Sequence, residues 1–419
     1  MRLLHIADVH LDTPFAGRSE PLRRRLQDAS REAFRRAVDL ALAEGVHAVV
    51  VAGDLFDGER LSFRTERFLL EQMARLGEAG VTVVYGTGNH DPGRDAYRTR
   101  PLPWPDHVIV ADDASPRRVV VLDGEERAVG RIVAVGHASR RETGDLSAAF
   151  PAPGPDLPEI AVLHTQVRGS RDEEAHDPYA PCELARLQAS GHDYWALGHV
   201  HLRQCLWTDP PIHYPGNLQG RTHKESGAKG ALLVDLTDRR APSVAFHSLA
   251  PVRFETVRVD GLEEAGTLDR LVRRAAAAWE AAREADPGDA ATEWVVRFVL
   301  EGGTPLWASL GDEEEREALA SDMAEALGLL DVEVRAGATH PVVQVEAHLR
   351  REDVLGAALR LVAAIRDGEA TLPGLAPEEL AGLDRPDAGD PGAYVRRLLE
   401  GAEAEVAARL LDPSARGAG

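Results

Sequence analysis

The sequence is poor in cysteine and contains no long apolar run. Only Cys182 and Cys205 occur among 419 residues, which gives neither a disulfide framework nor a thiolate metal site. No run of 18 or more apolar residues is present, so a membrane-spanning helix is not expected. The first residues, MRLLHIAD, lack the charged and then apolar pattern of a secretory signal. A folded protein of the reducing cytoplasm is therefore predicted.

The sequence also lacks the basic charge that DNA-binding proteins usually carry. The net charge is −21, and residues 251–419 contain 18 Lys and Arg against 34 Asp and Glu. Residues 1–250 contain 30 against 35. Because neutralisation of phosphates drives affinity for nucleic acids, bulk charge alone does not hold DNA on this chain. The acidic second part indicates either a protein partner or a gain in solubility.

The first 250 residues alternate short apolar runs with amphipathic segments. The expected strands are 3–7, 46–52 and 81–85, and the expected helices are 21–44 and 62–79. This order is typical of a layered α/β sheet with its functional groups at the strand ends. Shorter strand-like segments follow a proline at residue 101, at 117–122, 128–135, 160–163, 194–197, 230–236 and 243–248. Residues 1–250 are predicted to form a two-sheet α/β sandwich.

A second, smaller α+β domain is predicted at 251–370. Its expected strands are 253–259, 292–300, 331–335 and 341–347, and its expected helices are 263–284, 312–328 and 351–366. Residues 371–419 are predicted to be a linker, rich in Pro, Gly and Asp at 371–392, and a final amphipathic helix at 393–411. That helix either packs on its own domain or docks a partner.

Five short polar motifs follow strand-like segments. In order, they are Asp8-Val9-His10, Gly53-Asp54-Leu55-Phe56-Asp57, Gly88-Asn89-His90-Asp91, His164-Thr165 and Gly198-His199-Val200-His201. One such motif alone is a weak signal, but all five in this order are a strong one. The side chains offer oxygen and imidazole nitrogen without sulfur, which suits Mn²⁺, Fe²⁺ or Mg²⁺ better than structural zinc.

The spacing within the motifs favours a site for two metals. Residues i and i+2 of an extended chain point the same way, so Asp8 and His10 can bind one metal. Asp54 stands at a strand end, where its carboxylate can bridge two metals, and Asn89 offers a neutral carbonyl oxygen. Two metals about 3.5–4 Å apart bind a hydroxide and hold a phosphoryl group for in-line attack. The pattern therefore predicts a dinuclear phosphoesterase.

The five motifs together resemble the signature of the calcineurin-like metallophosphoesterase superfamily. The resemblance implies a non-ligand catalytic role for His90, which would stabilise the transition state or protonate the leaving oxygen. It implies two divalent ions, with Mn²⁺ expected. The ligand sets that it implies are Asp8, His10, Asp54 and His201 for one metal, and Asp54, Asn89, His164 and His199 for the other.

The longer context resembles bacterial DNA-repair exonucleases of the SbcD type, with the YhaO-type branch the best match. LHIADVHLD at 4–12 and YPGNLQGR at 214–221 carry this resemblance, which covers about residues 1–250. It implies a DNA exonuclease, also expected to act as an endonuclease at unusual ends, with a capping domain and an SbcC-like coiled-coil ATPase as partner. Relatives form homodimers, although no helix pair here demands one. Some relatives have a histidine three residues after the bridging aspartate, but here this residue is Asp57, so no second assisting histidine is assigned.

Basic residues near the motifs leave alternatives open. Arg221 and His223 are candidates for contacts with DNA phosphates, against the alternative of an exposed hydrophilic loop. The arginines of the helix at 21–44 are expected mostly on a solvated face. They are Arg23, Arg24, Arg25, Arg31, Arg35 and Arg36.

Two other functions compete with the DNA exonuclease. The first is a phosphodiesterase for a small nucleotide-type substrate, because the same metal chemistry serves any phosphodiester. The second is a mainly architectural component of an ATPase complex. The intact set of candidate ligands, together with His90, argues against an inactive component.

Overall fold

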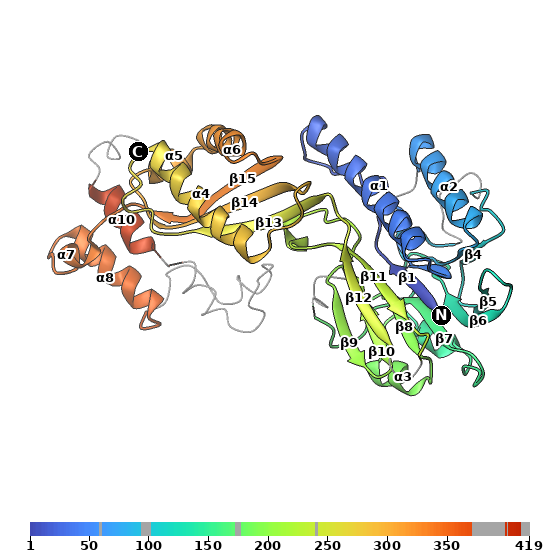
Figure 1. Cartoon of the computed structure of the whole chain (residues 1–419). Coiled ribbons are helices and arrows are strands. Elements are labelled where there is room, and N and C mark those ends of the chain that lie inside the picture. Colours follow the sequence, from blue (N-terminus) through green and yellow to red (C-terminus); the bar gives the residue numbers. More distant parts are fainter. Residues whose placement is uncertain are drawn as a thin grey trace. The chain divides into compact units, whose positions relative to one another are not determined.

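The protein forms two compact units in its computed structural model (Figure 1). The first unit comprises Met1–Phe254 and Gly288–Trp294, and the second comprises Glu255–Pro287 and Val295–Gly419. The structure describes residues 1–57, 61–93, 102–171, 177–238, 242–370, 399 and 401–411. The predicted linker at 371–392 lies outside the described residues, as do residues 393–398 of the predicted final helix. None of the helices in the described ranges combines the length and apolar character that crossing a membrane requires.

The first unit contains two six-stranded sheets. Its strands are β1 (Arg2–Ile6), β2 (Ala48–Ala52), β3 (Thr82–Gly86), β4 (Val108–Ala111), β5 (Arg117–Leu122), β6 (Ala128–Val135), β7 (Glu159–His164), β8 (Tyr194–Gly198), β9 (Gln204–Thr208), β10 (Pro211–Tyr214), β11 (Gly230–Asp235) and β12 (Ser243–Ser248). The sheet orders are β12-β11-β1-β2-β3-β4 and β5-β6-β7-β8-β10-β9. β1 to β4 run parallel to one another, as do β6, β7, β8 and β10. The predicted two-sheet α/β sandwich is confirmed.

The central strands are buried on both faces. In β1, Leu4 and Ile6 belong to the core under the helices, whereas Leu3 belongs to the core between the sheets. β2 alternates in the same way, with Val49 and Val51 on the helix side. Strands covered on both faces read as continuous apolar runs, which is why their sequence signal is strong. The two sheets thereby bring the carboxyl ends of their parallel strands together.

Helices cover the outer faces of this sandwich. α1 (Glu20–Ala43) and α2 (Phe63–Glu78) lie side by side against the first sheet (Figure 1), and α3 (Leu184–Ala189) packs on the second through Leu187. Ser62 caps the start of α2, because its hydroxyl accepts a hydrogen bond from the backbone nitrogen of Thr65 at 3.2 Å. Two short 3₁₀ segments, η1 (Leu146–Ala149) and η3 (His223–Glu225), lie in the connections.

The second unit is a small α+β arrangement. It contains most of a sheet of order β13-β14-β15, formed by β13 (Val252–Val259), β14 (Glu293–Gly303) and β15 (Asp331–His340); the first residues of β13 and β14 belong to the first unit. Its helices are α4 (Leu268–Ala285), α5 (Trp307–Gly311), α6 (Glu313–Leu327), α7 (Val345–Leu349), α8 (Val354–Arg366) and α10 (Ala402–Leu411). The side chain of Asp312 caps the start of α6, and Gly328 caps its end with a φ of +62°, which suits glycine.

The predicted strand at 341–347 is wrong, because α7 begins within it and no strand occupies it. β15 continues to His340, and Pro341 then lacks the amide hydrogen that a strand ladder needs. The apolar side chains of Val343 and Val345 pack instead against α8, where Leu359 is buried. The alternating valines of this segment therefore pack in a cluster of helices and not in a sheet. α10 packs on the same cluster and contacts α8, as expected for a helix that packs on its own domain.

Candidate dinuclear metal centre

The five motifs meet at the carboxyl ends of strands in the two facing sheets. Asp8 follows β1, Asp54 follows β2 and Asn89 follows β3 in the first sheet. His164 ends β7 and His199 follows β8 in the second sheet. Because β2 contacts both β7 and β8, the two sets of strand ends lie side by side. Residues as far apart in the sequence as Asp8 and His201 thus form one cluster.

Two glycines allow this close approach. A Cβ atom at Gly53 would lie 2.2 Å from Nδ1 of His164, and one at Gly198 would lie 1.7 Å from the carbonyl oxygen of Ala52. Both distances are far below van der Waals contact, and Gly53 also has a φ of +87°. The glycines that precede Asp54 and His199 are therefore required by packing at the site.

One group of candidate ligands contains Asp8, His10 and His201, whose ligand atoms all lie within 4.8 Å of one another. Nε2 of His10 is 3.2 Å from Nε2 of His201 and 3.7 Å from Oδ2 of Asp54. Nε2 of His201 is 3.8 Å from Oδ1 of Asp8. The set predicted for the first metal is therefore brought together.

A second group contains Asp8, Asp54 and His164, again with ligand atoms within 4.8 Å. Nε2 of His164 lies 3.4 Å from Oδ2 of Asp54 and 2.9 Å from Oδ1 of Asn89. Asp54 thus borders both groups, as a bridging ligand must. The His199 ring centroid is 5.2 Å from that of His164, but its Nε2 is 2.9 Å from the carbonyl oxygen of Asp177. His199 is near the second group without belonging to it in this conformation.

The burial and charge of the cluster favour a bound cation. Asp8 and Asp54 are at most 1 % exposed, and burial together with the charge of Asp54 raises the pKa of Asp8 well above its usual value. Burial lowers the pKa of His10 and His164 well below the usual range, which leaves both imidazoles neutral. Burying nearby carboxylates costs free energy unless a cation compensates their charge, and the neutral imidazoles do not supply one. These oxygen and nitrogen donors fit divalent metals of the Mn²⁺, Fe²⁺ and Mg²⁺ type.

The backbone around these ligands adopts an unusual conformation. Asp8, His10, Asp54 and His199 have φ values of +50°, +48°, +52° and +104°. Non-glycine residues with positive φ carry a strain of about 1–3 kcal/mol each and persist where the surrounding structure holds them, often at functional sites. The fold therefore constrains the backbone of the candidate ligands.

His90 lies at the edge of this cluster and faces the cavity. Its side chain is 42 % exposed, and its Nδ1 is 2.8 Å from Oδ1 of Asp57. Burial opposes protonation of His90, but the hydrogen bond to Asp57 and the charges of Asp54 and Asp57 outweigh it, so the pKa is raised. His10, Asp57 and His90 also form a group of metal-ligand geometry. Asp57, however, already accepts hydrogen bonds from Thr13 and Arg221, which makes it an orienting partner for His90.

Sequence reasoning did not predict a role for Asp91, which organises two of the motif loops. Its buried carboxylate accepts hydrogen bonds from the backbone nitrogens of Leu55 at 2.5 Å and Gly88 at 2.7 Å, and from the Tyr85 hydroxyl at 2.5 Å. Burial and the nearby Asp54 charge raise the pKa of Asp91 to about 6. Its place beside His90 in the Gly-Asn-His-Asp motif was the only available signal.

Glu225 is a second residue that sequence reasoning missed. Its Oε1 is 2.7 Å from Nδ1 of His201, and its Oε2 accepts the backbone nitrogen of Arg221 at 2.6 Å. Burial alone would raise its pKa, but the hydrogen bonds and charges of His201 and Arg221 hold the pKa of Glu225 far below its usual value. A carboxylate on Nδ1 fixes the tautomer that leaves Nε2 of His201 available to a metal.

Glu225→Gln is therefore expected to weaken metal binding by about 10–100-fold, the usual effect of losing such a partner. Isothermal titration of the metal-free protein with Mn²⁺ would measure the affinity. Glu183→Gln, an exposed glutamate paired with Arg168 at 3.4 Å, is the control and should bind as the wild type does. An unchanged affinity in Glu225→Gln would show that Glu225 does not support a ligand.

A cavity of about 820 Å³ opens onto the cluster. It is lined by Asp54, Asn89, His90, Arg140, Asp177, Tyr179, His199, His201, Arg221, Thr222, Lys224 and Glu225. Arg221 therefore lies where sequence reasoning expected a substrate contact. His223 does not line the cavity, because it is only 5 % exposed and its ring packs edge-on against Phe254. A direct phosphate contact is not proposed for His223.

Comparison with known proteins places this site in a family. Residues 1–203 match the calcineurin-like phosphoesterases. The metallophosphoesterase YhaO of Bacillus subtilis, itself described as uncharacterised, is 34 % identical over 334 residues, which cover 78 % of each chain. This chain belongs to the calcineurin-like metallophosphoesterase family.

Other relatives of this metallophosphoesterase are DNA repair proteins and nucleases. The DNA double-strand break repair protein Mre11 of Methanopyrus kandleri is 27 % identical over 420 residues, which cover 93 % of this chain and 87 % of the relative. A component of the SbcCD nuclease of Bacillus subtilis is 26 % identical over 266 residues, which cover 56 % of this chain and 66 % of the relative. Family membership makes the protein a hydrolase of phosphate esters with a candidate dinuclear metal site.

Proposed function

We propose that this metallophosphoesterase is a Mn²⁺-dependent DNA exonuclease that acts in DNA repair in the cytoplasm. The observation that carries the proposal is the cavity in which four candidate metal ligands and His90 lie beside three cationic side chains. The similarity of the chain to Mre11 and to the SbcCD nuclease component supports DNA as the substrate. Endonuclease action at unusual DNA ends is part of the same proposal.

The proposed ligands are the side chains that the strand ends bring together. One metal would be held by Asp8, His10, Asp54 and His201, and the other by Asp54, Asn89, His164 and His199. When bound, a metal pair supplies a hydroxide nucleophile at neutral pH and neutralises charge on the phosphoryl group. The protein contributes an enclosed, oriented donor set and the positioning of the substrate.

His90 is the proposed catalytic residue. A hydrogen bond donated from its Nδ1 to Asp57 would leave Nε2 for the reacting phosphate. With a raised pKa, the imidazole carries a proton at neutral pH more readily than a free histidine does. It can therefore protonate the leaving oxygen or stabilise the charge that develops there.

Three cationic side chains offer contacts to DNA phosphates, although the chain as a whole is acidic. Arg140, Arg221 and Lys224 line the cavity, Arg140 from the connection after β6 and the other two from the connection between β10 and β11. Arg221 donates to Asp57 at 3.2 Å and is held in place, whereas Lys224 is exposed to solvent. Contacts of this kind position a DNA strand without reading its sequence. The proposal therefore places the phosphates next to the scissile bond at these side chains.

Lys224→Ala is expected to weaken DNA binding at low salt and to reduce the slope of log K against log salt by about one, because one phosphate contact is lost. Fluorescence anisotropy with a labelled duplex in Mg²⁺, using His90→Ala as the background to prevent cleavage, would measure it. Arg168→Ala, an exposed arginine outside the cavity, should leave the slope unchanged. Equal slopes in Lys224→Ala and the parent would exclude a phosphate contact at Lys224.

The proposed function is tested with end-labelled duplex, single-stranded and hairpin DNA in Mn²⁺, Mg²⁺ or EDTA. We expect Mn²⁺-dependent shortening of DNA that EDTA abolishes. An aryl phosphodiester is assayed in parallel. Its hydrolysis without any cleavage of DNA would support a small nucleotide-type substrate instead. The cavity volume of about 820 Å³ lies within the range of small-molecule sites, which is the observation in favour of that alternative.

We also propose a partner, an SbcC-like coiled-coil ATPase, from the similarity to the SbcCD nuclease component. The α7, α8 and α10 cluster is the candidate docking element, since Leu361 of α8 and Leu410 and Leu411 of α10 are 47 %, 38 % and 42 % exposed. Co-purification of the ATPase with the full chain, and its loss when residues 393–411 are deleted, would support this. Unchanged association after the deletion would exclude the final helix as the docking element.

A further inference from the structure

The loop after β1 has a strained backbone that continues beyond the candidate metal ligands. Asp12 has a φ of +64° and Phe15 a φ of +45°, in addition to the positive φ values of Asp8 and His10. Four such residues in one loop need contacts that hold them in place. Asp12 is neither in a ligand group nor in the cavity wall. Its side chain is instead turned toward the helices.

The carboxylate of Asp12 joins the loop to both helices. Its Oδ2 accepts the backbone nitrogen of Ser62, the residue that caps α2, at 2.6 Å. Its Oδ1 accepts the hydroxyl of Thr65 at 2.6 Å and Nη1 of Arg31 at 3.4 Å. The loop therefore moves only if these contacts with α1 and α2 are broken.

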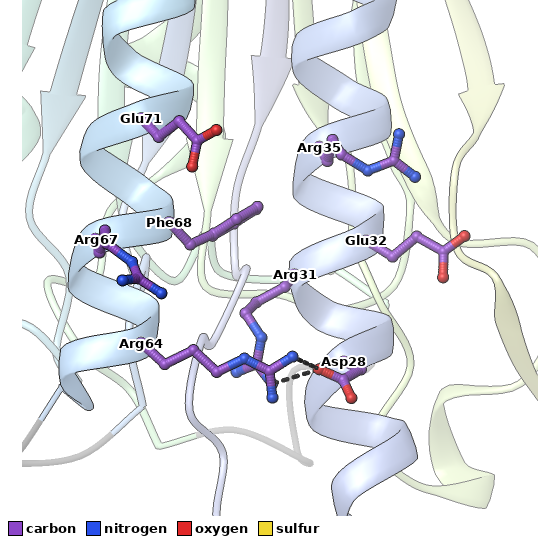
Figure 2. A pocket seen from close by; sticks show the side chains of 8 residues that line it. All are labelled: Asp28, Arg31, Glu32, Arg35, Arg64, Arg67, Phe68 and Glu71. Carbon is purple, nitrogen blue, oxygen red and sulfur yellow. Dashed lines mark hydrogen bonds and ion pairs between the residues drawn. The ribbon is translucent and has the colours of Figure 1, made fainter.

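Arg31 is the centre of this contact. It was expected on the solvated face of α1, but its side chain is only 10 % exposed. Nη1 also contacts the hydroxyl of Thr65 at 3.1 Å, and Nη2 donates to Asp28 at 2.7 Å. Figure 2 shows the side chain of Arg31 descending from α1 to Asp28, where Arg64 of α2 also pairs at 2.8 Å. Such a two-sided contact needs the planar guanidinium of arginine.

From Asp12 the contacts continue to the catalytic histidine through the next residue. The hydroxyl of Thr13 lies 2.9 Å from Oδ2 of Asp57 and also 2.9 Å from the carbonyl oxygen of His10. Gln27 of α1 donates to the carbonyl oxygen of Thr13 at 3.2 Å. Asp57 in turn holds Nδ1 of His90 at 2.8 Å through its other oxygen. A shift of Asp12 would therefore displace Thr13, which together with Arg221 holds Asp57 in its orientation.

We propose that Arg31 is a positioning residue for His90, acting through Asp12, Thr13 and Asp57. A buried ion pair contributes little net stability, because desolvation offsets the attraction. Its value here lies in fixing the loop geometry on which the angle of the His90 imidazole depends. This inference rests on the catalytic role proposed for His90, and it holds whether or not DNA is the substrate.

Arg31→Met tests the proposal, because methionine keeps an unbranched side chain and removes the guanidinium. With an aryl phosphodiester in Mn²⁺, we expect kcat to fall by about 10–100-fold, the effect of a misplaced catalytic group, and KM to change less than about twofold. Arg31→Lys should recover part of kcat. Arg35→Met, one turn further along α1, removes an exposed guanidinium paired with Asp39 and should match the wild type. Thermal melting separates these effects from loss of folded protein.

Thr13→Val tests the contact between Thr13 and Asp57, which lies between Arg31 and His90 in the proposed series of contacts. It should lower kcat as Arg31→Met does, and the double variant should lose little more, since both changes act on one path. Effects on kcat that multiply in the double variant would overturn the proposal. So would a melting temperature that falls in Arg31→Met while kcat of the folded protein stays at the wild-type value.

A second readout does not depend on turnover. In the Mg²⁺-loaded full chain with ¹⁵N-histidine, the His90 ring signals, assigned with His90→Gln, report which ring nitrogen carries the proton. At a pH high enough for the His90 imidazole to be neutral, we expect a single tautomer protonated at Nδ1 in the wild type and Arg35→Met, and a mixture in Arg31→Met. Identical His90 signals in all three proteins would overturn it.

Discussion

His90→Ala is expected to lower kcat by about 10²–10⁴-fold, the usual contribution of a general acid or base, while the metal content stays at the wild-type level. The imidazole faces the cavity beside the ligand groups, and its partner at Nδ1 is Asp57. Its backbone nitrogen donates to Oδ1 of Asp54 at 2.9 Å, and alanine keeps that hydrogen bond. The loss should therefore fall on the chemical step. Turnover of an aryl phosphodiester and of end-labelled DNA, with metal content measured by mass spectrometry, checks this.

Two further variants sharpen this result. Asp57→Asn keeps the shape of the side chain but removes the charge that holds the His90 proton, so an intermediate loss of kcat is expected. His348 lies in the second unit, and His348→Ala is the control for the loss of an imidazole away from the cavity. Loss of a metal ion together with activity in His90→Ala would contradict the proposed role. It would instead assign His90 to the group formed with His10 and Asp57 as a ligand.

The layered fold could be read from the sequence because its strongest signals are local. β1, β2 and β3 are apolar runs buried on both faces and end at glycine or aspartate, so periodicity and turn residues both mark them. Three strands had no such signal and were not predicted. β4 and β10 have only four residues each, and β9, at the edge of the second sheet, is largely exposed. Strands that are very short or largely exposed leave little pattern in a sequence.

The candidate ligands could be found because strand ends bring them together whatever the intervening sequence is. The residues that orient them could not. Glu225 reaches His201 across 24 positions, and Arg221 reaches Asp57 across 164. Asp12 stands in an identified motif, yet its role depends on where α1 and α2 lie in space. Hydrogen bonds between distant loops depend on tertiary packing, for which one sequence carries no periodic signal.

Asp8→Asn is expected to change stability with opposite signs in the absence and presence of metal. The raised pKa of Asp8 means that its charged form is disfavoured in the folded, metal-free protein. Metal-free wild type therefore loses stability as pH rises above the ordinary carboxyl value of 3.8. Asparagine removes this cost, and each kcal/mol gained raises the melting temperature by about 2–4 °C. In EDTA at neutral pH, Asp8→Asn should melt above the wild type.

In Mn²⁺, the wild type should instead melt above Asp8→Asn. A metal that binds only the folded state stabilises it according to its concentration relative to Kd, and the wild type has the complete ligand set. Asp322→Asn, an exposed aspartate of α6, controls for the loss of one negative charge and should follow the wild type in both conditions. Thermal scans in EDTA and in Mn²⁺ provide the test. A lower melting temperature for Asp8→Asn in EDTA would mean that the hydrogen bonds from the backbone nitrogen of His199 to the Asp8 carboxylate, at 3.1 Å to each oxygen, outweigh its repulsion from Asp54. The opposite result would show that the fold accepts a local loss of stability in order to hold two carboxylates where a cation can bind.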